Sequence, residues 1–313
     1  GYSPEKLDAF AQYALESKYN EKALEDSGIS MNGDRGWYDR FRGRVMFPIH
    51  SISGRVLGFG GRILKNNVKA AKYLNSPENP IYHKSKVLYG LHQAKQEIVK
   101  KDEAFLVEGY TDVLSFHQNG VRNVVSSSGT SLTDGQIIML KRYSSNITLL
   151  YDGDAAGIRA SFRGLDMMLE AGINVRVVPF PDGEDPDSFA QKHNTEELEK
   201  FLAVERKDFI SYKTSALLEE VGNDPLKRAE MVRDVVSSIS KVPDAIGQEV
   251  FIKEAAKILD IDPRALHEEL ARLLDAQNRQ ARRKYSESPP MEALPPMEKI
   301  ATPFGHHQEE KVI

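Results

Sequence analysis

The strongest constraint on the fold is a regular alternation of apolar runs and helical patterns between residues 87 and 194. Short apolar runs such as AFLV and NITLLY alternate with longer segments, such as YTDVLSFHQ, in which apolar residues recur every three or four positions. Strands that alternate with helices in this way are typical of a parallel sheet with helices on both faces. We therefore expect an α/β fold whose strands are buried on both sides.

Helical and hairpin patterns flank this central region. Residues 4–27 have apolar positions at helical spacing, which predicts two short helices. Residues 38–62 contain two β-rich runs split by SISGR, which predicts a hairpin with projecting basic side chains. The proline-broken residues 72–90 predict an irregular connector, and residues 195–274 predict a small group of helices.

The composition changes after Ala276, where five of the fifteen prolines occur, and this segment is expected to be a disordered linker or tail. Because the chain begins with Gly rather than Met, we also expect it to be a piece of a longer protein. The sequence thus predicts four parts: a basic α/β subdomain (1–86), the central domain (87–194), a helical subdomain (195–275) and a disordered tail (276–313).

Composition excludes several kinds of protein and site. No run approaches the ~18 consecutive apolar residues that a membrane span needs, so we expect a soluble protein without membrane contact. The chain contains no cysteine, which excludes disulfides and thiolate metal sites and fits the reducing cytoplasm. Any metal site must therefore use oxygen or imidazole ligands.

The modest net charge of -4 conceals an uneven distribution of charge along the chain. Residues 35–100 hold thirteen Lys and Arg against three Asp and Glu, so the remaining residues are strongly acidic. A basic block next to acidic clusters suits an enzyme that binds polyanions and uses metal ions. The alternative is an ordinary solvated basic surface.

Acidic side chains follow three of the predicted strands. Because the carboxyl ends of parallel strands meet at one edge of a sheet, we expect these acids to lie close together. Carboxylates in close contact repel unless a cation neutralises them, and Mg²⁺ and Mn²⁺ prefer oxygen ligands. We predict a site for two or more such cations, with helix capping as the alternative role of these acids. The acids are Glu108, Asp112, Asp152, Asp154, Asp182, Glu184, Asp185 and Asp187.

A glutamate that ends one strand, followed by a DxD pair that ends a later one, resembles the Toprim domain of topoisomerases, bacterial primases and certain nucleases. Seven longer motifs narrow the choice: FRGRVMFPI, GFGGRIL, KYLNSPE, YHKSKVLYGL, VEGYTDVLS, LLYDGDAAG and PDGEDPD. Together they resemble the RNA polymerase domain of bacterial DnaG-type primases over residues 2–270. The resemblance implies a basic N-terminal α/β subdomain, a central Toprim sheet and a C-terminal helical bundle.

The resemblance also implies an activity and partners. It implies a DNA-directed RNA polymerase that makes short RNA primers on single-stranded DNA during replication in the bacterial cytoplasm, by divalent-metal-dependent nucleotidyl transfer. Its ligands would be the template, nucleoside triphosphates and the RNA–DNA hybrid. Family members usually begin with a cysteine-liganded zinc ribbon and end in a helicase-binding domain. Neither can be recognised here, so we expect no zinc, and contacts with the replicative helicase and single-strand-binding protein are expected only of the longer protein.

The resemblance assigns roles to individual residues. Glu108, Asp152 and Asp154 would hold the catalytic Mg²⁺, for which Mn²⁺ could substitute, and Glu108 could also act as a general base. Asp112, Asp185 and Asp187 would complete a neighbouring cation site. The residues that would contact nucleotide phosphates or the template and hybrid backbone are Arg42, Arg44, Arg62, Lys72, Asn75 and Lys84.

Several alternatives remain open at this point. Tyr73 could stack on a base or pack in the protein. The turn SSSGTSLT could bind a phosphate through backbone amides, or Thr133 could simply cap the following helix. A Toprim nuclease or topoisomerase would use the same acids to cut DNA, and a non-catalytic module would bind nucleic acid without chemistry.

Overall fold

The computed structural model describes residues 1–65, 70–129, 131–151, 155–181, 183–222 and 224–287. Residues 1–271 form one compact unit, and the chain from Arg272 onward forms a second. No helix within the described ranges is both long enough and apolar enough to cross a lipid bilayer.

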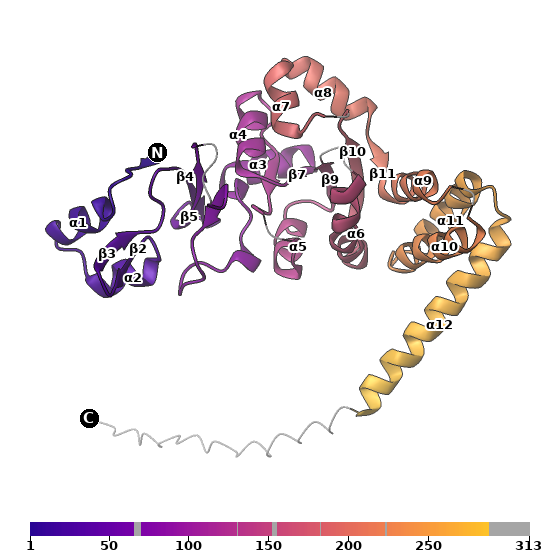
Figure 1. Ribbon diagram of the computed structural model, residues 1–313. Coiled ribbons are helices and arrows are strands. Elements are labelled where there is room, and N and C mark those ends of the chain that lie inside the picture. The colour runs from indigo at the N-terminus through magenta and orange to yellow at the C-terminus, as the bar shows by residue number, and fades with distance from the viewer. Residues whose placement is uncertain (66–69, 130, 152–154, 182, 223, 288–313) are drawn as a thin grey trace, which may run out of the picture. The chain divides into compact units, whose positions relative to one another are not determined.

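A five-stranded sheet lies at the centre of the larger unit (Figure 1), in the order β11-β10-β9-β7-β8. Strands β7 to β10 run parallel, and the short β11 pairs antiparallel with β10 at one edge. The predicted parallel sheet is therefore confirmed, and β7 and β8, which consist mostly of apolar residues, are fully buried. The strands are β7 (Ala104–Val107), β8 (Val124–Ser126), β9 (Asn146–Tyr151), β10 (Asn174–Pro179) and β11 (Lys207–Asp208).

Helices cover both faces of this sheet, as predicted. Helices α4, α7 and α8 lie on one side and α5 and α6 on the other (Figure 1), while α3 packs near β8. Polar caps begin several of them, as when Asn194 accepts the Glu197 N–H at the start of α8. Their bounds are α3 (Leu91–Lys101), α4 (Tyr110–Gln118), α5 (Asp134–Lys141), α6 (Ala155–Glu170), α7 (Pro186–Lys192) and α8 (Thr195–Val204).

The N-terminal region contains an antiparallel sheet in the order β1-β4-β5-β6. The predicted hairpin is confirmed as β4 and β5, but β6 lies in the segment that we expected to be irregular and pairs with β5. The predicted pair of short helices is present as α1 and α2. The elements are β1 (Tyr2–Ser3), α1 (Ala9–Glu16), α2 (Glu21–Ser27), the hairpin β2 (Ser30–Gly33) and β3 (Gly36–Asp39), β4 (Arg44–His50), β5 (Val56–Ile63), β6 (Tyr73–Asn75) and the 3₁₀ turn Lys84–Lys86.

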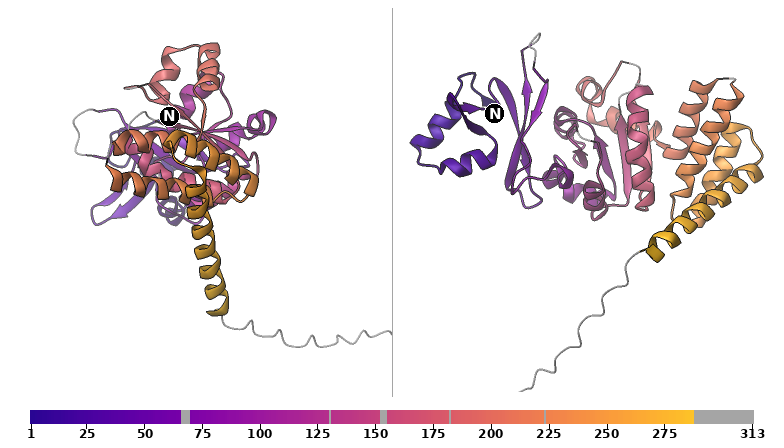
Figure 2. Two further views of the ribbon diagram at one scale, coloured as in Figure 1. Left: turned by 90° about the vertical axis from the view of Figure 1, so that its right-hand side faces the viewer. Right: turned by 60° about the horizontal axis from the view of Figure 1, so that its bottom comes forward.

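The C-terminal region is helical, with α9, α10 and α11 packed side by side (Figure 2). The last helix corrects one prediction: α12 continues to Glu287, so residues 276–287 are helical rather than part of a disordered tail. The apolar spacing ends near Leu274, but the following Gln, Arg, Ala, Lys and Glu are good helix formers and prolong the helix. The helices are α9 (Phe209–Val221), α10 (Pro225–Ser240), α11 (Ala245–Leu259) and α12 (Pro263–Glu287).

One hydrophobic core joins the antiparallel sheet to the parallel one. Phe47 of β4 stacks on Tyr110 of α4, with ring centroids 5.0 Å apart, and Tyr89 meets the same ring edge-on at 4.7 Å. Gly60 of β5 permits this approach, because a Cβ atom there would lie 2.4 Å from the Tyr110 ring. This core contains residues from both sides of residue 86, so it does not separate two domains there. The predicted domain boundaries at residues 86 and 194 stay predictions.

Candidate nucleotide and metal site

The carboxyl ends of β7, β9 and β10 lie at the same edge of the parallel sheet. Leu106 pairs with Leu149, and Tyr151 pairs with Pro179, so the three neighbouring strands end in register. Glu108 follows β7 directly, and Asp152 follows β9 directly. The predicted convergence of the acids at this edge stays a prediction, because Asp152 and Asp154 lie outside the described residues.

The first pair of acids lies at the junction of β7 and α4. The Glu108 side chain is exposed, and the Asp112 side chain is half-buried in the first turn of the helix. The Gly109 N–H donates to Asp112 Oδ2 over 2.7 Å, so this carboxylate caps the helix. Helix capping was the alternative role for these acids, and Asp112 has that role in the structure.

The second pair of acids lies at the start of α7, which packs against α4. Asp185 is the N-cap, and its Oδ1 accepts the Ser188 N–H over 2.6 Å. Asp187 accepts from the Ser115 hydroxyl of α4 and, over 2.6 Å, from Gln191 Nε2. Packing of α7 on α4 therefore brings Asp187 to the helix that carries Asp112.

These acids fit a cation site in their chemistry. All six predicted ligands are carboxylates, which are the hard oxygen donors that Mg²⁺ and Mn²⁺ prefer. Within the described ranges no group of three or more His, Asp or Glu side chains is close enough to hold a metal ion. The predicted cation site also includes Asp152 and Asp154, which lie outside the described residues.

Asn75 and Lys84 line a small pocket beside this edge. Their pocket also includes Ser127 and Ser128 of the turn that follows β8. Asn75 Nδ2 donates to the Ser128 carbonyl over 3.1 Å, and the Tyr110 hydroxyl donates to Asn75 Oδ1 over 2.8 Å. The structure thus brings two of the predicted nucleotide contacts to one place, next to the predicted phosphate-binding turn.

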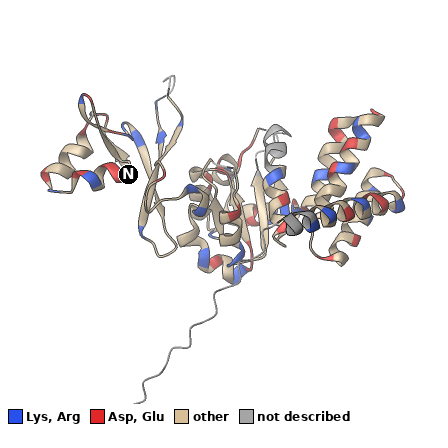
Figure 3. Cartoon of the chain, turned by 90° about the horizontal axis from the view of Figure 1, so that it is seen from below, with Lys and Arg blue, Asp and Glu red and all other residues tan. Residues whose placement is uncertain are grey.

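The remaining basic residues differ in their surroundings. Arg42 and Lys72 are exposed, and the guanidinium carbon of Arg62 lies 5.6 Å from the centre of the Tyr73 ring. Tyr73 is half-buried, and its hydroxyl lies 3.5 Å from the Thr111 hydroxyl, which matches the packing alternative for this residue. Figure 3 shows basic residues on the strands of the antiparallel sheet with few acidic ones between them.

Arg44 has a different use from the one predicted. Its side chain is only 6% exposed, and its two terminal nitrogens donate to the carbonyls of Gly61, Ala71 and Lys72 over 2.9 to 3.2 Å. Burial lowers the pKa of this guanidinium from its usual value. Arg44 therefore holds β5 and the chain before β6 together, in place of the predicted phosphate contact.

The turn after β8 ends in an ordinary helix cap. Thr133 Oγ1 accepts the Gln136 N–H over 3.3 Å and donates to the Ser85 carbonyl over 2.7 Å. Ser128 has a left-handed backbone conformation, with φ of 60°. Thr133 therefore caps α5, which was one of its two possible roles. Phosphate binding by the turn stays a prediction.

The sequence reasoning missed the central position of Tyr110. This side chain is 2% exposed and connects Phe47, Tyr89 and Asn75. Burial raises its pKa well above the usual value and raises the pKa of Tyr89 to about 12, so both hydroxyls are neutral at physiological pH. The signal in the sequence was the motif GFGG, in which Gly60 leaves space for the Tyr110 ring of the motif EGYTD.

Three family models match the chain. The N-terminal domain of the DNA primase catalytic core matches residues 1–95, and the Toprim-like model matches residues 105–190. The DnaB-helicase binding domain of primase matches residues 210–264. This third match contradicts our expectation that no helicase-binding domain can be recognised in the chain. It covers α9 to α11, whose generic helical spacing carries no short motif that reasoning from residues could identify.

Relatives and solved structures agree with these matches. The DNA primase of Staphylococcus aureus is 35% identical over 272 residues, which are 86% of this chain and 45% of the relative. A DNA primase domain from Pseudomonas aeruginosa has a TM-score of 0.74 at 32% identity, covering 87% of this chain and 86% of that one. A DnaG primase catalytic domain bound to single-stranded DNA has a TM-score of 0.72 at 36% identity, covering 82% of this chain and 84% of that one.

The chain spans less than half the length of the curated relatives that it matches. The similarity nevertheless extends through the antiparallel sheet, the parallel sheet and the helices that follow it. The chain belongs to the family of bacterial DnaG-type DNA primases and carries the region that contains their Toprim fold.

Proposed function

We propose that this chain is the catalytic part of a DNA primase, a DNA-directed RNA polymerase that synthesises short RNA primers on single-stranded DNA. The observation that carries the proposal is the shared edge of β7, β9 and β10, where acids follow neighbouring strands in a fold that belongs to the primase family. The reaction is attack of a 3′ hydroxyl on an α-phosphate with departure of pyrophosphate, in which positioning and charge neutralisation dominate.

In this proposal the acids hold divalent cations. Glu108, Asp152 and Asp154 hold the catalytic ion, and Asp112, Asp185 and Asp187 complete a neighbouring site through oxygens beyond those used in helix capping. When bound, Mg²⁺, or Mn²⁺ in its place, supplies positive charge that stabilises the attacking and leaving oxygens. Glu108 is exposed at the end of β7, where its carboxylate can also accept the proton of the attacking hydroxyl.

Polar and basic residues beside the acids orient the substrates. Asn75 is held by Tyr110 and Ser128, so its amide is preorganised, and Lys84 lines the same pocket. Lys72 and Arg42 are exposed and can meet phosphates of the template or the hybrid. Arg62 is kept beside Tyr73 by a cation–π contact. Arg44 is buried and stabilises this surface through its hydrogen bonds to β5 and to the chain before β6.

The partners follow from the same proposal. Single-stranded DNA is the template, as the DNA-bound relative suggests, and nucleoside triphosphates and the RNA–DNA hybrid are substrate and product. The match of residues 210–264 supports contact with the replicative helicase, and we place single-strand-binding protein among the partners of the longer protein. The protein would act at bacterial replication forks in the cytoplasm.

Incubation of the chain with single-stranded DNA, nucleoside triphosphates and Mg²⁺ or Mn²⁺ tests the activity. We expect short RNA products that depend on both the template and the metal. The rival Toprim nuclease would instead shorten or nick the DNA without making RNA, and that result would overturn the proposal.

Removal of a phosphate contact should weaken binding to single-stranded DNA. Lys72→Ala and Lys84→Ala are each expected to reduce the slope of log affinity against log salt by about 0.7, the value for one phosphate contact on a single strand. Fluorescence anisotropy at several salt concentrations measures this slope. Lys257→Ala on the exposed face of α11 is the matched control and should leave the slope unchanged. Unaltered slopes in both test variants would exclude these lysines from the binding surface.

A further inference from the structure

A groove of about 570 Å³ lies between the turn that joins β4 to β5, the segment before α3, and the helices α3 and α5. Ligand sites in proteins usually have volumes of about 300 to 1,000 Å³. Leu88 and Leu91 are almost completely buried at its floor, whereas Ile52 is exposed at its rim. The described residues that line the groove include none to which the proposed function gives a role. Its apolar lining residues are Ile52, Leu57, Val87, Leu88, Leu91 and Met139.

The turn at residues 51–55 forms one wall of the groove and is held against α3. The Ile52 carbonyl accepts two hydrogen bonds from α3, one from His92 Nδ1 over 3.0 Å and one from Lys95 Nζ over 2.7 Å. Gly54 lies against the His92 ring, and its φ of 90° is a left-handed conformation that favours glycine. The groove is therefore preformed, which lowers the entropic cost of binding a partner.

The charged groups that line the groove are basic. Lys86 is exposed, and Lys95 uses one of its three N–H donors on the Ile52 carbonyl, so two remain for a ligand. Burial and the nearby His92 lower the pKa of His50, which leaves this imidazole neutral at physiological pH. Among the described residues that line the groove there is no Asp or Glu. Two ammonium groups beside an apolar floor complement a ligand that carries carboxylates next to a large apolar side chain.

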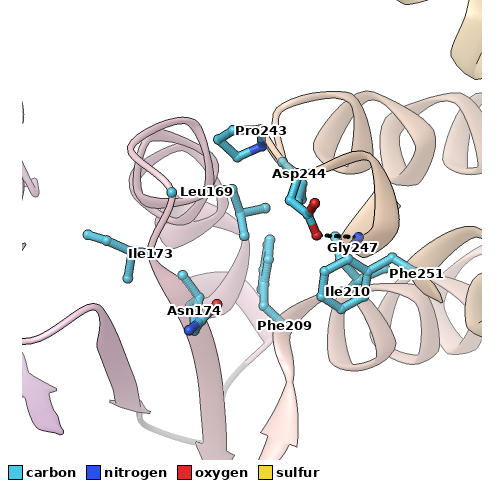
Figure 4. A pocket seen from close by; sticks show the side chains of 12 residues that line it. Leu169, Ile173, Asn174, Phe209, Ile210, Pro243, Asp244, Gly247 and Phe251 are labelled. Carbon is cyan, nitrogen blue, oxygen red and sulfur yellow. Dashed lines mark hydrogen bonds between the residues drawn. The ribbon is translucent and has the colours of Figure 1, made fainter. Parts of the chain in front are cut away.

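A second apolar pocket lacks this combination. It has a volume of about 290 Å³ and lies between the end of α6, β10 and the helices α9 and α11 (Figure 4). Phe209 and Phe251 line it, and Asp244 is the one charged side chain among the described residues around it. The Asp244 carboxylate already accepts the Gly247 N–H over 2.6 Å as the cap of α11. This second pocket therefore offers no positive charge to an acidic ligand.

A single strand of nucleic acid is the alternative occupant of a groove with basic residues. Proteins that bind single strands combine basic residues with aromatic side chains on which the bases stack. The described lining of the groove contains no Phe, Tyr or Trp, and aliphatic side chains predominate. Arg62, a proposed phosphate contact, lies six residues along β5 from Val56 at the turn, which is about 20 Å along a strand. These observations favour a peptide over nucleic acid.

We propose that this groove is the docking site for a short peptide segment of a partner protein, in which acidic residues stand next to a large apolar side chain. The apolar side chain packs on Leu88 and Leu91, and the carboxylates meet the ammonium groups of Lys86 and Lys95. Docking here holds the partner on the chain and leaves the residues assigned to nucleotide and template free.

The test uses the absence of cysteine from the chain, because one introduced thiol then reports on one place only. Ser53→Cys exchanges one atom on the exposed wall of the groove, and Ser17→Cys does the same on an exposed surface after α1. Each variant is equilibrated in a thiol–disulfide buffer with four peptides, and mass spectrometry of the intact protein measures the mixed disulfides. Each peptide joins Cys-Gly to either Asp-Asp or Lys-Lys, followed by either Leu-Leu or Ser-Ser.

Ser53→Cys is expected to capture the acidic Leu-Leu peptide about tenfold more than the acidic Ser-Ser peptide, the factor for burial of one large apolar side chain. It should also prefer the acidic to the basic Leu-Leu peptide about threefold, and this preference should fall as salt rises. Ser17→Cys should capture all four peptides within about twofold of one another. Lys86→Glu, added to Ser53→Cys, should remove the preference for the acidic peptide, and Lys200→Glu on the exposed face of α8 is its matched control.

Equal capture of the four peptides by Ser53→Cys would overturn the proposal, as would the same selectivity in Ser17→Cys. A preference for the acidic peptide that survives Lys86→Glu unchanged would remove the lysine from the site and contradict the charge argument. Capture of a thiol-bearing oligothymidylate in preference to the acidic Leu-Leu peptide would assign the groove to nucleic acid and overturn the proposal as well.

Discussion

Asp152→Asn is expected to reduce primer synthesis about 10³-fold while leaving affinity for single-stranded DNA within about twofold. The substitution replaces an anionic ligand by a neutral amide of the same shape. Metal ions contribute several kcal/mol of transition-state stabilisation in such reactions, and each 1.36 kcal/mol is a factor of ten in rate. Template binding depends instead on basic side chains elsewhere and should persist.

RNA product per unit time and anisotropy of labelled DNA measure the two quantities on the same preparation. Asp224→Asn is a suitable control, because Asp224 caps α10 through the Leu226 N–H and Asn is an equally good cap. It should retain full activity. Parallel loss of synthesis and DNA binding in Asp152→Asn would point to a structural role, and unchanged synthesis would remove this acid from the metal site.

Gly60→Ala is expected to lower the free energy of unfolding by about 2 kcal/mol, within the usual range for overpacking a core. The added Cβ would lie 2.4 Å from Cζ of Tyr110 and 2.7 Å from its hydroxyl. Tyr110 is enclosed by Phe47 and Tyr89, so its ring cannot move away without disturbing both neighbours. Urea denaturation followed by circular dichroism measures the change.

A double-mutant cycle separates this clash from the general cost of altering a glycine. In the background of Tyr110→Leu the same Gly60→Ala substitution should cost less than about 0.5 kcal/mol, because the ring it would strike is absent. Equal costs in both backgrounds would show that the strand, rather than the ring, requires glycine. The cycle therefore tests the contact that joins the two sheets.

The parallel sheet could be predicted because its signal is local and repeated. Each strand between Ala104 and Pro179 contains a short apolar run, and each intervening helix has its own periodicity. Strands β7, β9 and β10 pair on both sides, and β8 pairs with β7 at one edge of the sheet. Strands β6 and β11 have three and two residues, too few to form a pattern, and exist because a neighbouring strand offers hydrogen bonds. The extension of α12 to Glu287 follows intrinsic helix propensity without an apolar stripe.

In the candidate site, too, some features could be predicted from the sequence and others could not. The common edge at which β7 and β9 end follows from parallel pairing and could be predicted from the order of the motifs. The capping of α4 by Asp112 and of α7 by Asp185, and the burial of Arg44, depend on atoms that come from other segments or on exact helix starts. A motif shows which residue types occur in a region, but it does not show which of those side chains form hydrogen bonds within the folded protein.

By itself the sequence determined the central α/β architecture and the family, because these depend on periodicity and on the order of motifs along the chain. Only the tertiary structure decided that Tyr110 joins the two sheets, that Arg44 supports the backbone, and that Asp166 is held by Ser238 and Lys241. These contacts join residues 17 to 75 positions apart, and no local pattern in the chain specifies which distant partner a buried polar group will meet.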